Sequence, residues 1–230
     1  MKKIGVIFAD TQEYLPFVKY YSDNIIEKKT VCSHKAVICA DEKSGKEIVA
    51  IHSGIGKVNA ANATAILIYL FGVDAVLNAG LSGAVSSVVR EDIVAGTSYV
   101  ECDFDLTAIG YGLGVKPDGE EYVHMADEKL LEAVAKVKCA HVKQGKLGTG
   151  DLFLTDNVKK KLFKETFDIT AFDMETGAIA AICSKNDIPF LSVRKISDDA
   201  DDASESAYRE MNDRQEDILS RIIIETIENI

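Results

Sequence analysis

Short apolar runs alternate with amphipathic segments along most of the chain, and this alternation limits the possible folds more than any other feature of the sequence. The runs are rich in β-branched and aliphatic residues and are too short for helices, so we expect buried strands. These predicted strands span Ile4 to Ala9, Val37 to Ala40, Ile48 to His52, Ala75 to Asn78, Ile93 to Val100 and Pro189 to Val193.

Segments with a helical spacing of apolar residues separate these runs. The last of them places Ile218, Ile222 and other aliphatic residues on one face, which predicts packing against a sheet. Alternating strands and helices are typical of an α/β sandwich with helices on both faces of the sheet. No Pro-rich linker or repeat interrupts the pattern, so residues 1–230 are predicted to form a single domain. The predicted helices span Asn59 to Phe71, Asp127 to Val137, Asp156 to Lys164, Met174 to Lys185, and Ala203 to about Glu228.

Composition excludes several classes of protein. The 26 Lys and Arg residues stand against 37 Asp and Glu, a formal charge of −11 that argues against nucleic acid as a partner. The most apolar stretch, Ala63 to Val73, is shorter than the ~18 residues that a membrane span needs. Five cysteines without a CxxC pair suit reduced thiols in the cytoplasm. No His or Cys spacing indicates a metal site, and we expect no cofactor.

The segment from Asp103 to Tyr122 departs from this regular pattern. It contains Gly110, Gly112, Gly114, Pro117 and Gly119, which predicts a long loop after a strand. Loops of this length in compact domains usually carry function or form interfaces. We therefore expect this loop to contribute to a site or to a contact between two copies of the chain.

Two glycine-rich segments follow predicted strands. Ser53 to Lys57 opens a helix, where backbone N–H groups can hold an anion, but it lacks the residues of a triphosphate loop or a dinucleotide fingerprint. Asn78 to Ala84 ends another strand, where small residues would let a substrate approach the backbone. Each segment can also be a tight turn with glycines at positive φ, and the sequence alone leaves both interpretations open.

Three carboxylates lie near predicted strand ends. Glu13 follows the first strand, Glu175 precedes a predicted helix, and Asp198 follows the strand that ends near Arg194. Such a set could cleave a glycosidic bond, with one acid protonating the leaving group and another activating water. Each carboxylate could equally be a helix cap or a solvated charge, and residues 198–202 could form an acidic surface loop.

Taken together, these motifs resemble the nucleoside phosphorylase superfamily and, within it, the 5′-methylthioadenosine/S-adenosylhomocysteine nucleosidases. The resemblance covers nearly the whole chain and implies a three-layer αβα sandwich with a mixed central sheet. The matching residues are Lys3 to Ile7 with Glu13, Ser53 to Val58, Asn78 to Gly83, Asp103 to Tyr111, Gly148 to Phe153, Asp173 to Glu175, and Val193 to Asp198.

The resemblance implies hydrolysis of the bond between adenine and ribose. Asp198, held by Ser197, would be the acid that protonates adenine N7, and Glu13 with Arg194 would activate water. Glu175 would bind the ribose hydroxyls and stabilise the cationic sugar. The implied substrate contacts are Phe153 stacked on adenine, Leu154 at the base edge, Met174 and Asp173 near the ribose, Ile55 in the glycine-rich turn, and Asp10.

Hydrolases and phosphorylases share this fold, so the nucleophile needs a separate argument. The related hexameric phosphorylases carry an arginine where this chain has Asn78, and a Gly and Arg phosphate clamp where it has residues 10–13. A phosphate dianion would meet carboxylates here, which favours water. A purine nucleoside phosphorylase, a nucleosidase for another adenine nucleoside, and a catalytically silent nucleoside-binding protein remain as alternatives.

Some residues depart from the family pattern or point to a second subunit. Asp10 stands where the nucleosidases usually have an apolar residue, Leu81 where they often have a serine, and Asp173 where they have a longer glutamate. Asp10 therefore suggests a substrate with a polar or cationic 5′ group. Four further residues match positions around the 5′ substituent, with the loop reaching into the partner of a homodimer: Ile109, Tyr111, Pro117 and Tyr208.

Overall fold

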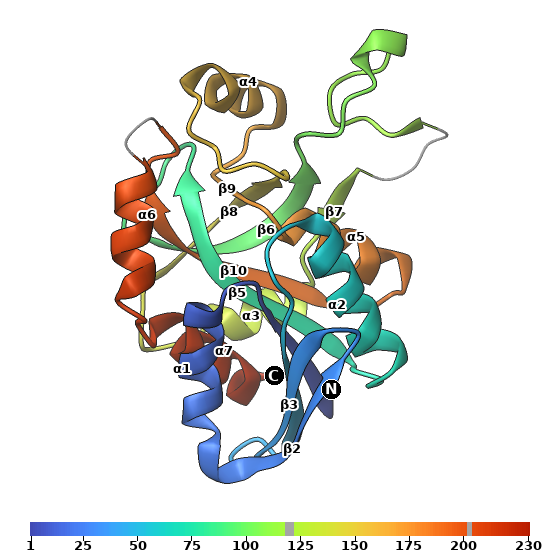
Figure 1. The fold of residues 1–230 in the computed structure, drawn as a ribbon, viewed down its shortest axis with the longest axis vertical. Helices are drawn as coiled ribbons and strands as arrows, with labels where there is room; N and C mark the ends of the chain where they lie inside the picture. The colour runs from blue at the N-terminus through green and yellow to red at the C-terminus, as the bar shows by residue number, and fades with distance from the viewer. Residues whose placement is uncertain (118–121, 202–203) are drawn as a thin grey trace.

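A computed structural model describes residues 1–117, 122–201 and 204–230. These residues form a ten-stranded mixed sheet between two layers of helices (Figure 1), the αβα sandwich that the sequence predicts. Helices α2 (Lys57–Tyr69) and α5 (Thr176–Lys185) pack together on one side. On the other side, α7 (Ile218–Asn229) contacts α1 (Thr11–Tyr20) and α3 (Glu128–Val134), and α6 (Ser204–Asp213) contacts the sheet.

Parallel strands form the centre of the sheet. Strand β1 (Lys3–Phe8) lies between β4 (Lys46–His52) and β5 (Ala75–Ala84), and β5 also pairs with β10 (Phe190–Asp198), all in parallel. Their apolar runs are buried on both faces, as parallel strands covered by helices require. Because these strands run the same way, their carboxyl ends meet at one edge, where such sheets bind ligands.

The sheet also curls into a ring at one end. Strand β10 pairs with both β5 and β6 (Ile93–Glu101), β6 continues to β8 (Val142–Thr149), and β9 (Ala171–Asp173) connects β8 back to β5. This closure brings the ends of β9 and β10 to the end of β5. The other strands are β2 (Ile25–Val31) and β3 (His34–Asp41) at the far edge and β7 (Val123–Met125) beside β6.

Several sequence expectations need correction. The strand expected to end at Asn78 continues to Ala84, and neither Gly80 nor Gly83 has a positive φ, so the interpretation of this segment as a turn is wrong. Similarly, β10 extends through Asp198, which is buried, so Asp198 is not part of an acidic surface loop. Asp202 lies outside the described residues.

The terminal helix expected from Ala203 to about Glu228 is two helices, α6 and α7. The intervening residues are polar, and Gln215 adopts a positive φ of 47°. Arg214 forms ion pairs there with Glu91, Glu210 and Glu216. With no apolar side chain to bury, this segment turns the chain instead of continuing the helix.

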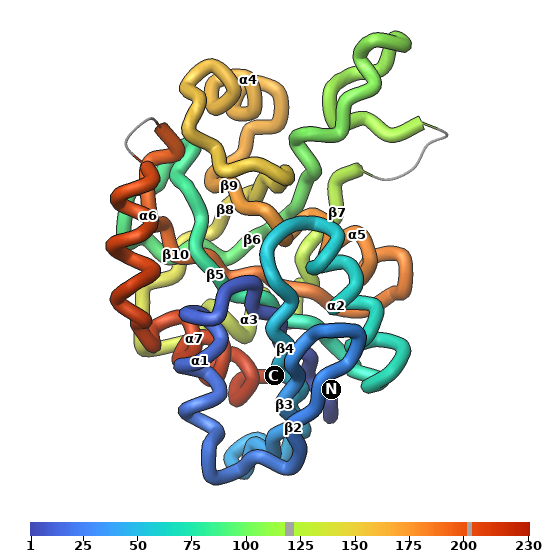
Figure 2. The backbone as a smooth tube through the Cα atoms, in the orientation of Figure 1, coloured from blue at the N-terminus to red at the C-terminus, as the bar shows by residue number. Residues whose placement is uncertain are grey.

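The loop after β6 projects from the body of the molecule (Figure 2). It holds a short 3-10 helix, Thr107–Ile109, and Gly110 and Gly114 adopt positive φ values. Its later part, including Gly119, lies outside the described residues. Helix α4 (Asn157–Phe167) lies beside this loop, where Phe167 limits the space around Gly114.

Candidate active site

A cavity of about 330 Å³ opens at the carboxyl edge of the parallel strands. Twelve of the fifteen predicted site residues line it, and they come from six separate segments of the chain. The N-cap and first turn of α1 supply two of them, and β10, the end of β9 and the two residues after β9 supply six. The twelve are Asp10, Glu13, Ile55, Phe153, Leu154, Asp173, Met174, Glu175, Arg194, Ser197, Asp198 and Tyr208.

Glu13 is positioned by the start of α1. Asp10 is the N-cap of this helix, and the two residues form a capping box, in which Asp10 N donates to Glu13 Oε2 at 3.2 Å. The other oxygen, Oε1, accepts from Leu81 N at 2.9 Å. Burial raises the pKa of Glu13 to about 7, although Arg194 opposes this shift. A carboxylate with this pKa is suited to act as a base near neutral pH.

Glu175 stands at the start of α5. Its Oε1 accepts from Gly56 N at 2.9 Å, and its Oε2 lies 3.8 Å from Arg194 Nη1. Burial raises the pKa of Glu175 to about 7, against the attraction of Arg194. The positive φ values of Gly54 and Gly56 confirm a tight turn before α2. One amide of this turn therefore holds a protein carboxylate.

Arg194 is the cation of the cavity, and it is almost completely buried. Its Nε donates to Ser192 Oγ and Thr176 Oγ1 at 3.1 Å, and its Nη2 donates to Asn78 Oδ1. These bonds fix the position of the guanidinium in the wall of the cavity. Asn78 does not itself line the cavity; it orients Arg194.

Asp173 lines the cavity, but its oxygens are already engaged by the protein. Oδ1 accepts from the backbone N of Glu175 at 2.9 Å, from the N of Thr176 at 2.8 Å and from Thr149 Oγ1 at 3.0 Å. Oδ2 accepts from Thr176 Oγ1 at 2.6 Å and lies 3.4 Å from Arg194 Nε. Asp173 therefore holds the start of α5, and with it Glu175, in place.

Asp198 is buried at the end of β10. Its Oδ1 accepts from Ala200 N at 2.9 Å, and its Oδ2 accepts from Ser197 Oγ at 2.6 Å. The Ser197 hydroxyl also lies 3.3 Å from the carbonyl oxygen of Ser82. Because a hydroxyl has one proton and can also accept, Ser197 can donate to ionised Asp198, or donate to Ser82 O and accept from protonated Asp198. Ser197 can thus serve both protonation states.

Aromatic side chains border the cavity. The rings of Phe153 and Tyr208 lie edge to face, with centroids 5.4 Å apart and an interplanar angle of 66°. Burial raises the pKa of the Tyr208 hydroxyl, and nearby carboxylates, Glu13 first among them, add to the shift. Phe153 remains partly exposed, which leaves its face available for stacking.

The structure does not bring three predicted residues to this cavity: Ile109, Tyr111 and Pro117 lie on the projecting loop. Sequence reasoning also missed lining residues. Ala9, Leu152 and Phe172 each directly precede a predicted site residue. Their position next to a predicted site residue is the sequence signal that could have identified them. Leu81, Ser82 and Gly83 belong to a motif noted in the sequence, and all three line the cavity.

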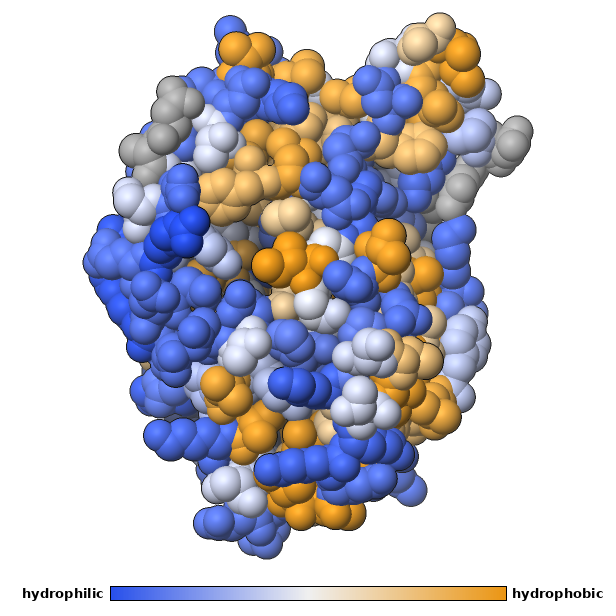
Figure 3. Space-filling model, viewed as in Figure 1, coloured by the Kyte–Doolittle hydropathy of each residue, from blue (hydrophilic) through white to orange (hydrophobic). Residues whose placement is uncertain are grey.

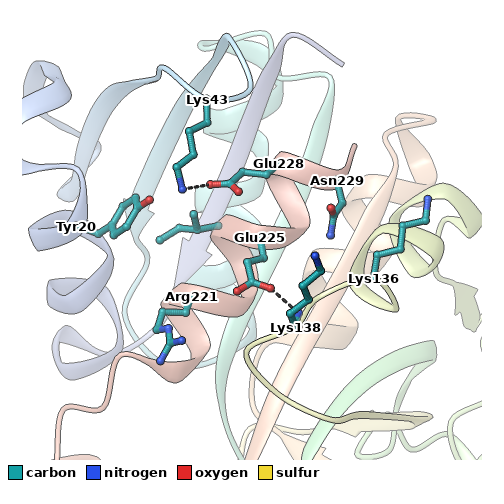
Figure 4. Close-up of a pocket in the computed structure, with 9 residues that line it drawn as sticks. Tyr20, Lys43, Lys136, Lys138, Arg221, Glu225, Glu228 and Asn229 are labelled. Carbon is teal, nitrogen blue, oxygen red and sulfur yellow. Dashed lines mark hydrogen bonds and ion pairs between the residues drawn. The ribbon is translucent and has the colours of Figure 1, made fainter.

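A second hollow of about 420 Å³ lies beside α7 (Figure 4) and shares no lining residue with the first cavity. Its acids are paired, since Lys43 contacts Glu228 at 2.9 Å and Glu225 accepts from Lys138 N at 2.6 Å. It contains none of the predicted site residues. The chemistry expected from the sequence therefore belongs to the first cavity.

Within residues 1–117, 122–201 and 204–230, no group of three or more His, Cys, Asp and Glu side chains is arranged to hold a metal ion. The helices of these same segments are all too short or too polar to cross a membrane.

Comparison with known proteins places the chain in a class. Residues 3–228 match the model of the phosphorylase superfamily. The nucleosidase of Anoxybacillus flavithermus for 5′-methylthioadenosine and S-adenosylhomocysteine is 38% identical over 173 residues, 72% of this chain and 74% of that protein. The corresponding nucleosidase of Actinobacillus succinogenes is 35% identical over 90% of both chains.

A solved structure supports the same assignment. The nucleosidase of Neisseria meningitidis in complex with methylthio-immucillin-A is 30% identical, with a TM-score of 0.88 over the full length of both chains. The chain belongs to the phosphorylase superfamily and, within it, to the 5′-methylthioadenosine/S-adenosylhomocysteine nucleosidases.

Proposed function

We propose that this chain hydrolyses the N-glycosidic bond of 5′-methylthioadenosine and S-adenosylhomocysteine and releases adenine. One observation carries the proposal: Glu13, Glu175 and Asp198, far apart in the sequence, are all buried around one cavity. Among the described residues, the charged side chains that line this cavity are five carboxylates and one arginine. Such a lining suits a sugar that becomes cationic as its bond to the base breaks.

At the base end, Asp198 delivers a proton to adenine N7, so that the base departs neutral. Ser197 orients the carboxyl group and can accept or donate as the proton leaves. Phe153 stacks on the adenine ring, and the backbone of buried Leu154 reads the base edge. This proton transfer makes the base a better leaving group, because the base then departs without a negative charge.

At the sugar end, Glu13 takes a proton from the attacking water. Its pKa of about 7 leaves a substantial fraction ionised at neutral pH. Arg194 lies beside Glu13 and helps to orient the water, and Glu175, with Met174 alongside, binds the ribose hydroxyls. The negative charge of Glu175 also stabilises the developing oxocarbenium ion.

Water, not phosphate, is the proposed nucleophile, because a phosphate dianion would be repelled by the carboxylates Asp10, Glu13 and Glu175. The test is to incubate the protein with 5′-methylthioadenosine, with and without inorganic phosphate, and to identify the sugar product. Free 5-methylthioribose in both reactions supports the proposal. A strictly phosphate-dependent sugar 1-phosphate would make the protein a phosphorylase, and binding without turnover would make it a silent nucleoside-binding protein.

The 5′ end of the substrate lies near Asp10, Ile55 and Tyr208 in this proposal. Asp10 adds a carboxylate to this part of the lining, beside the uncharged side chains of Ile55 and Tyr208. It therefore favours a 5′ group with a cationic amine, such as the homocysteinyl group. Another adenine nucleoside, such as 5′-deoxyadenosine or a futalosine-type compound, is distinguished by comparing kcat/KM across these substrates.

We also propose that two copies of the chain form a homodimer through α2 and the projecting loop. Helix α2 carries apolar residues on all sides and leaves Val58 80% exposed, together with Tyr69. Ile109 and Tyr111 are exposed on the loop. In Figure 3 apolar surface gathers over this loop and near the start of α2. A second copy would cover this surface. Ile109, Tyr111 and Pro117 of each copy would then lie near the cavity of the other copy.

The remaining proposals follow from composition. The charge of −11 and the five cysteines without a CxxC pair favour a cytoplasmic protein that binds no nucleic acid. The mechanism proposed above uses only groups of the protein and water, so it requires no cofactor.

A further inference from the structure

The hydroxyl group of Ser82 has no role in the reaction proposed above, yet it is buried beside the reacting groups. Ser82 lines the cavity and is 4% exposed. Its Oγ has no hydrogen-bond partner among the described residues. Buried hydroxyl groups are nearly always paired, so an unpaired one on the wall of a ligand cavity indicates a partner on the ligand.

The direction of the Ser82 side chain follows from its position in β5. A Cβ built at Gly80 would point at Arg194 Nη1 and Glu13 Oε1, and residues two apart in a strand face the same side. Ser82 therefore faces the cavity about 7 Å farther along the strand. Its neighbour Gly83 lies against Asp198, whose Oδ1 would be 3.0 Å from a Cβ built there. Along β5, Ser82 thus lies between Leu81, whose backbone N donates to Glu13, and Gly83, which lies against Asp198.

We propose that Ser82 Oγ donates a hydrogen bond to the adenine base at N3. This inference rests on the proposed function, in which N7 faces Asp198 and the edge with N1 faces the backbone of Leu154. Adenine has three ring acceptors, and N3 is the one that remains. N3 is adjacent to the ring carbon bonded to N9, so it lies at the junction of base and sugar, where Ser82 stands. A bond to N3, an acceptor that every purine base carries, would help to hold the base and would withdraw electron density from it as it departs.

The test compares Ser82→Ala with wild type on two substrates, 5′-methylthioadenosine and its 3-deaza analogue, in which a C–H group replaces N3. We expect kcat/KM to fall about 3- to 10-fold for 5′-methylthioadenosine, the worth of one hydrogen bond, and to stay unchanged for the analogue. The melting temperature of the free variant should stay the same or rise, because the substitution removes an unpaired buried hydroxyl.

Ser86→Ala is the matched control, because Ser86 Oγ donates to Ile169 O at 2.6 Å and does not line the cavity. It should lower stability and leave the ratio of kcat/KM for the two substrates unchanged. An equal loss on both substrates, or no loss on either, would overturn the N3 contact. A lower melting temperature of Ser82→Ala would show that the hydroxyl is structural. Failure of the proposed function would look different, since wild type itself would then release no adenine.

Discussion

The carboxylate of Glu13 and the guanidinium of Arg194 lie side by side over Gly80. A Cβ at this position would be 2.6 Å from Arg194 Nη1 and 2.9 Å from Glu13 Oε1. The glycine is needed here for close approach, since its φ is not positive. The backbone of β5 thus determines how the proposed water-activating pair sits in the cavity.

Gly80→Ala should therefore displace this pair. We expect kcat/KM for adenine release to fall about 100-fold, because misplacing reacting groups by about 1 Å has an effect of this size. Gly5→Ala is the control, because its Cβ would lie 2.9 Å from Leu67 Cδ1, away from the cavity. It should cost about 1–3 kcal/mol of stability through overpacking and leave kcat/KM of the folded protein unchanged. Equal activity of the two variants would show that the pair is not required.

The pKa of Glu13 predicts a specific dependence on pH. Activity needs the ionised carboxylate, so kcat/KM should rise with pH through about 7 and then level off on this limb. A pH–rate profile that is flat between pH 5.5 and 8.5 would exclude Glu13 as the base.

Glu13 should also make the stability of the fold depend on pH, and the direction of this dependence follows from its raised pKa. Its folded-state pKa is raised, so the folded protein keeps the proton that the unfolded chain loses above the ordinary pKa of 4.5. The stabilising contribution is complete below pH 4.5 and is lost as the pH rises through about 7. As the pH rises from 4.5 to above 7, the unfolding free energy of Glu13→Gln should therefore increase relative to that of wild type, by up to about 3 kcal/mol. Denaturant unfolding at several pH values measures the difference, which a constant offset would contradict.

Asp198→Asn should remove the proposed acid while preserving shape. We expect kcat to fall by about 10²- to 10⁴-fold with binding of a nucleoside analogue retained. Asp199→Asn is the control, because Asp199 is the adjacent carboxylate and is exposed. Adenine release followed by absorbance measures both variants. Similar rates for Asp198→Asn and wild type would contradict the role of Asp198 as the acid.

Asp10→Asn tests the preference at the 5′ end. The amide can still accept from Gln12 N, which Asp10 Oδ1 contacts at 2.7 Å, so the cap of α1 is kept while the charge is lost. We expect kcat/KM to fall several-fold for S-adenosylhomocysteine, whose amine loses a nearby carboxylate, and to change little for 5′-methylthioadenosine. Equal changes for both substrates would count against an electrostatic role for Asp10.

The homodimer is tested at Val58. Val58→Asp places a charge in the proposed interface and should shift the sedimentation of the protein from dimer to monomer. Val158→Asp is the control, because Val158 on α4 is equally exposed, at 78% against 80%. Wild-type protein that sediments as a monomer would overturn the proposal directly.

The sequence by itself was sufficient for the central strands and for the class of fold. Runs such as Ile4 to Ala9 are apolar throughout, and only a buried strand suits such a short run. It was not sufficient for β2 and β8, because their residues include Glu27, Lys29, Lys143 and Gln144 and show no apolar run. Strand β2 depends on backbone pairing with β3, the next strand along the chain, and β8 depends on pairing with β6, which is distant in the sequence. Helix α1 was missed because Asp10 and Glu13 resemble the polar end of a strand, although they form the cap of a helix.

Sequence motifs also identified most of the lining of the site, since each motif lies at a strand end and parallel strand ends meet at one edge. What only the tertiary structure decided is the environment of each group. The pKa values near 7 of Glu13 and Glu175 arise because burial removes water from both carboxylates, against the attraction of one arginine. The unpaired hydroxyl of Ser82 and the saturated oxygens of Asp173 were likewise invisible in the sequence, because hydrogen bonding and desolvation depend on neighbours from other segments of the chain.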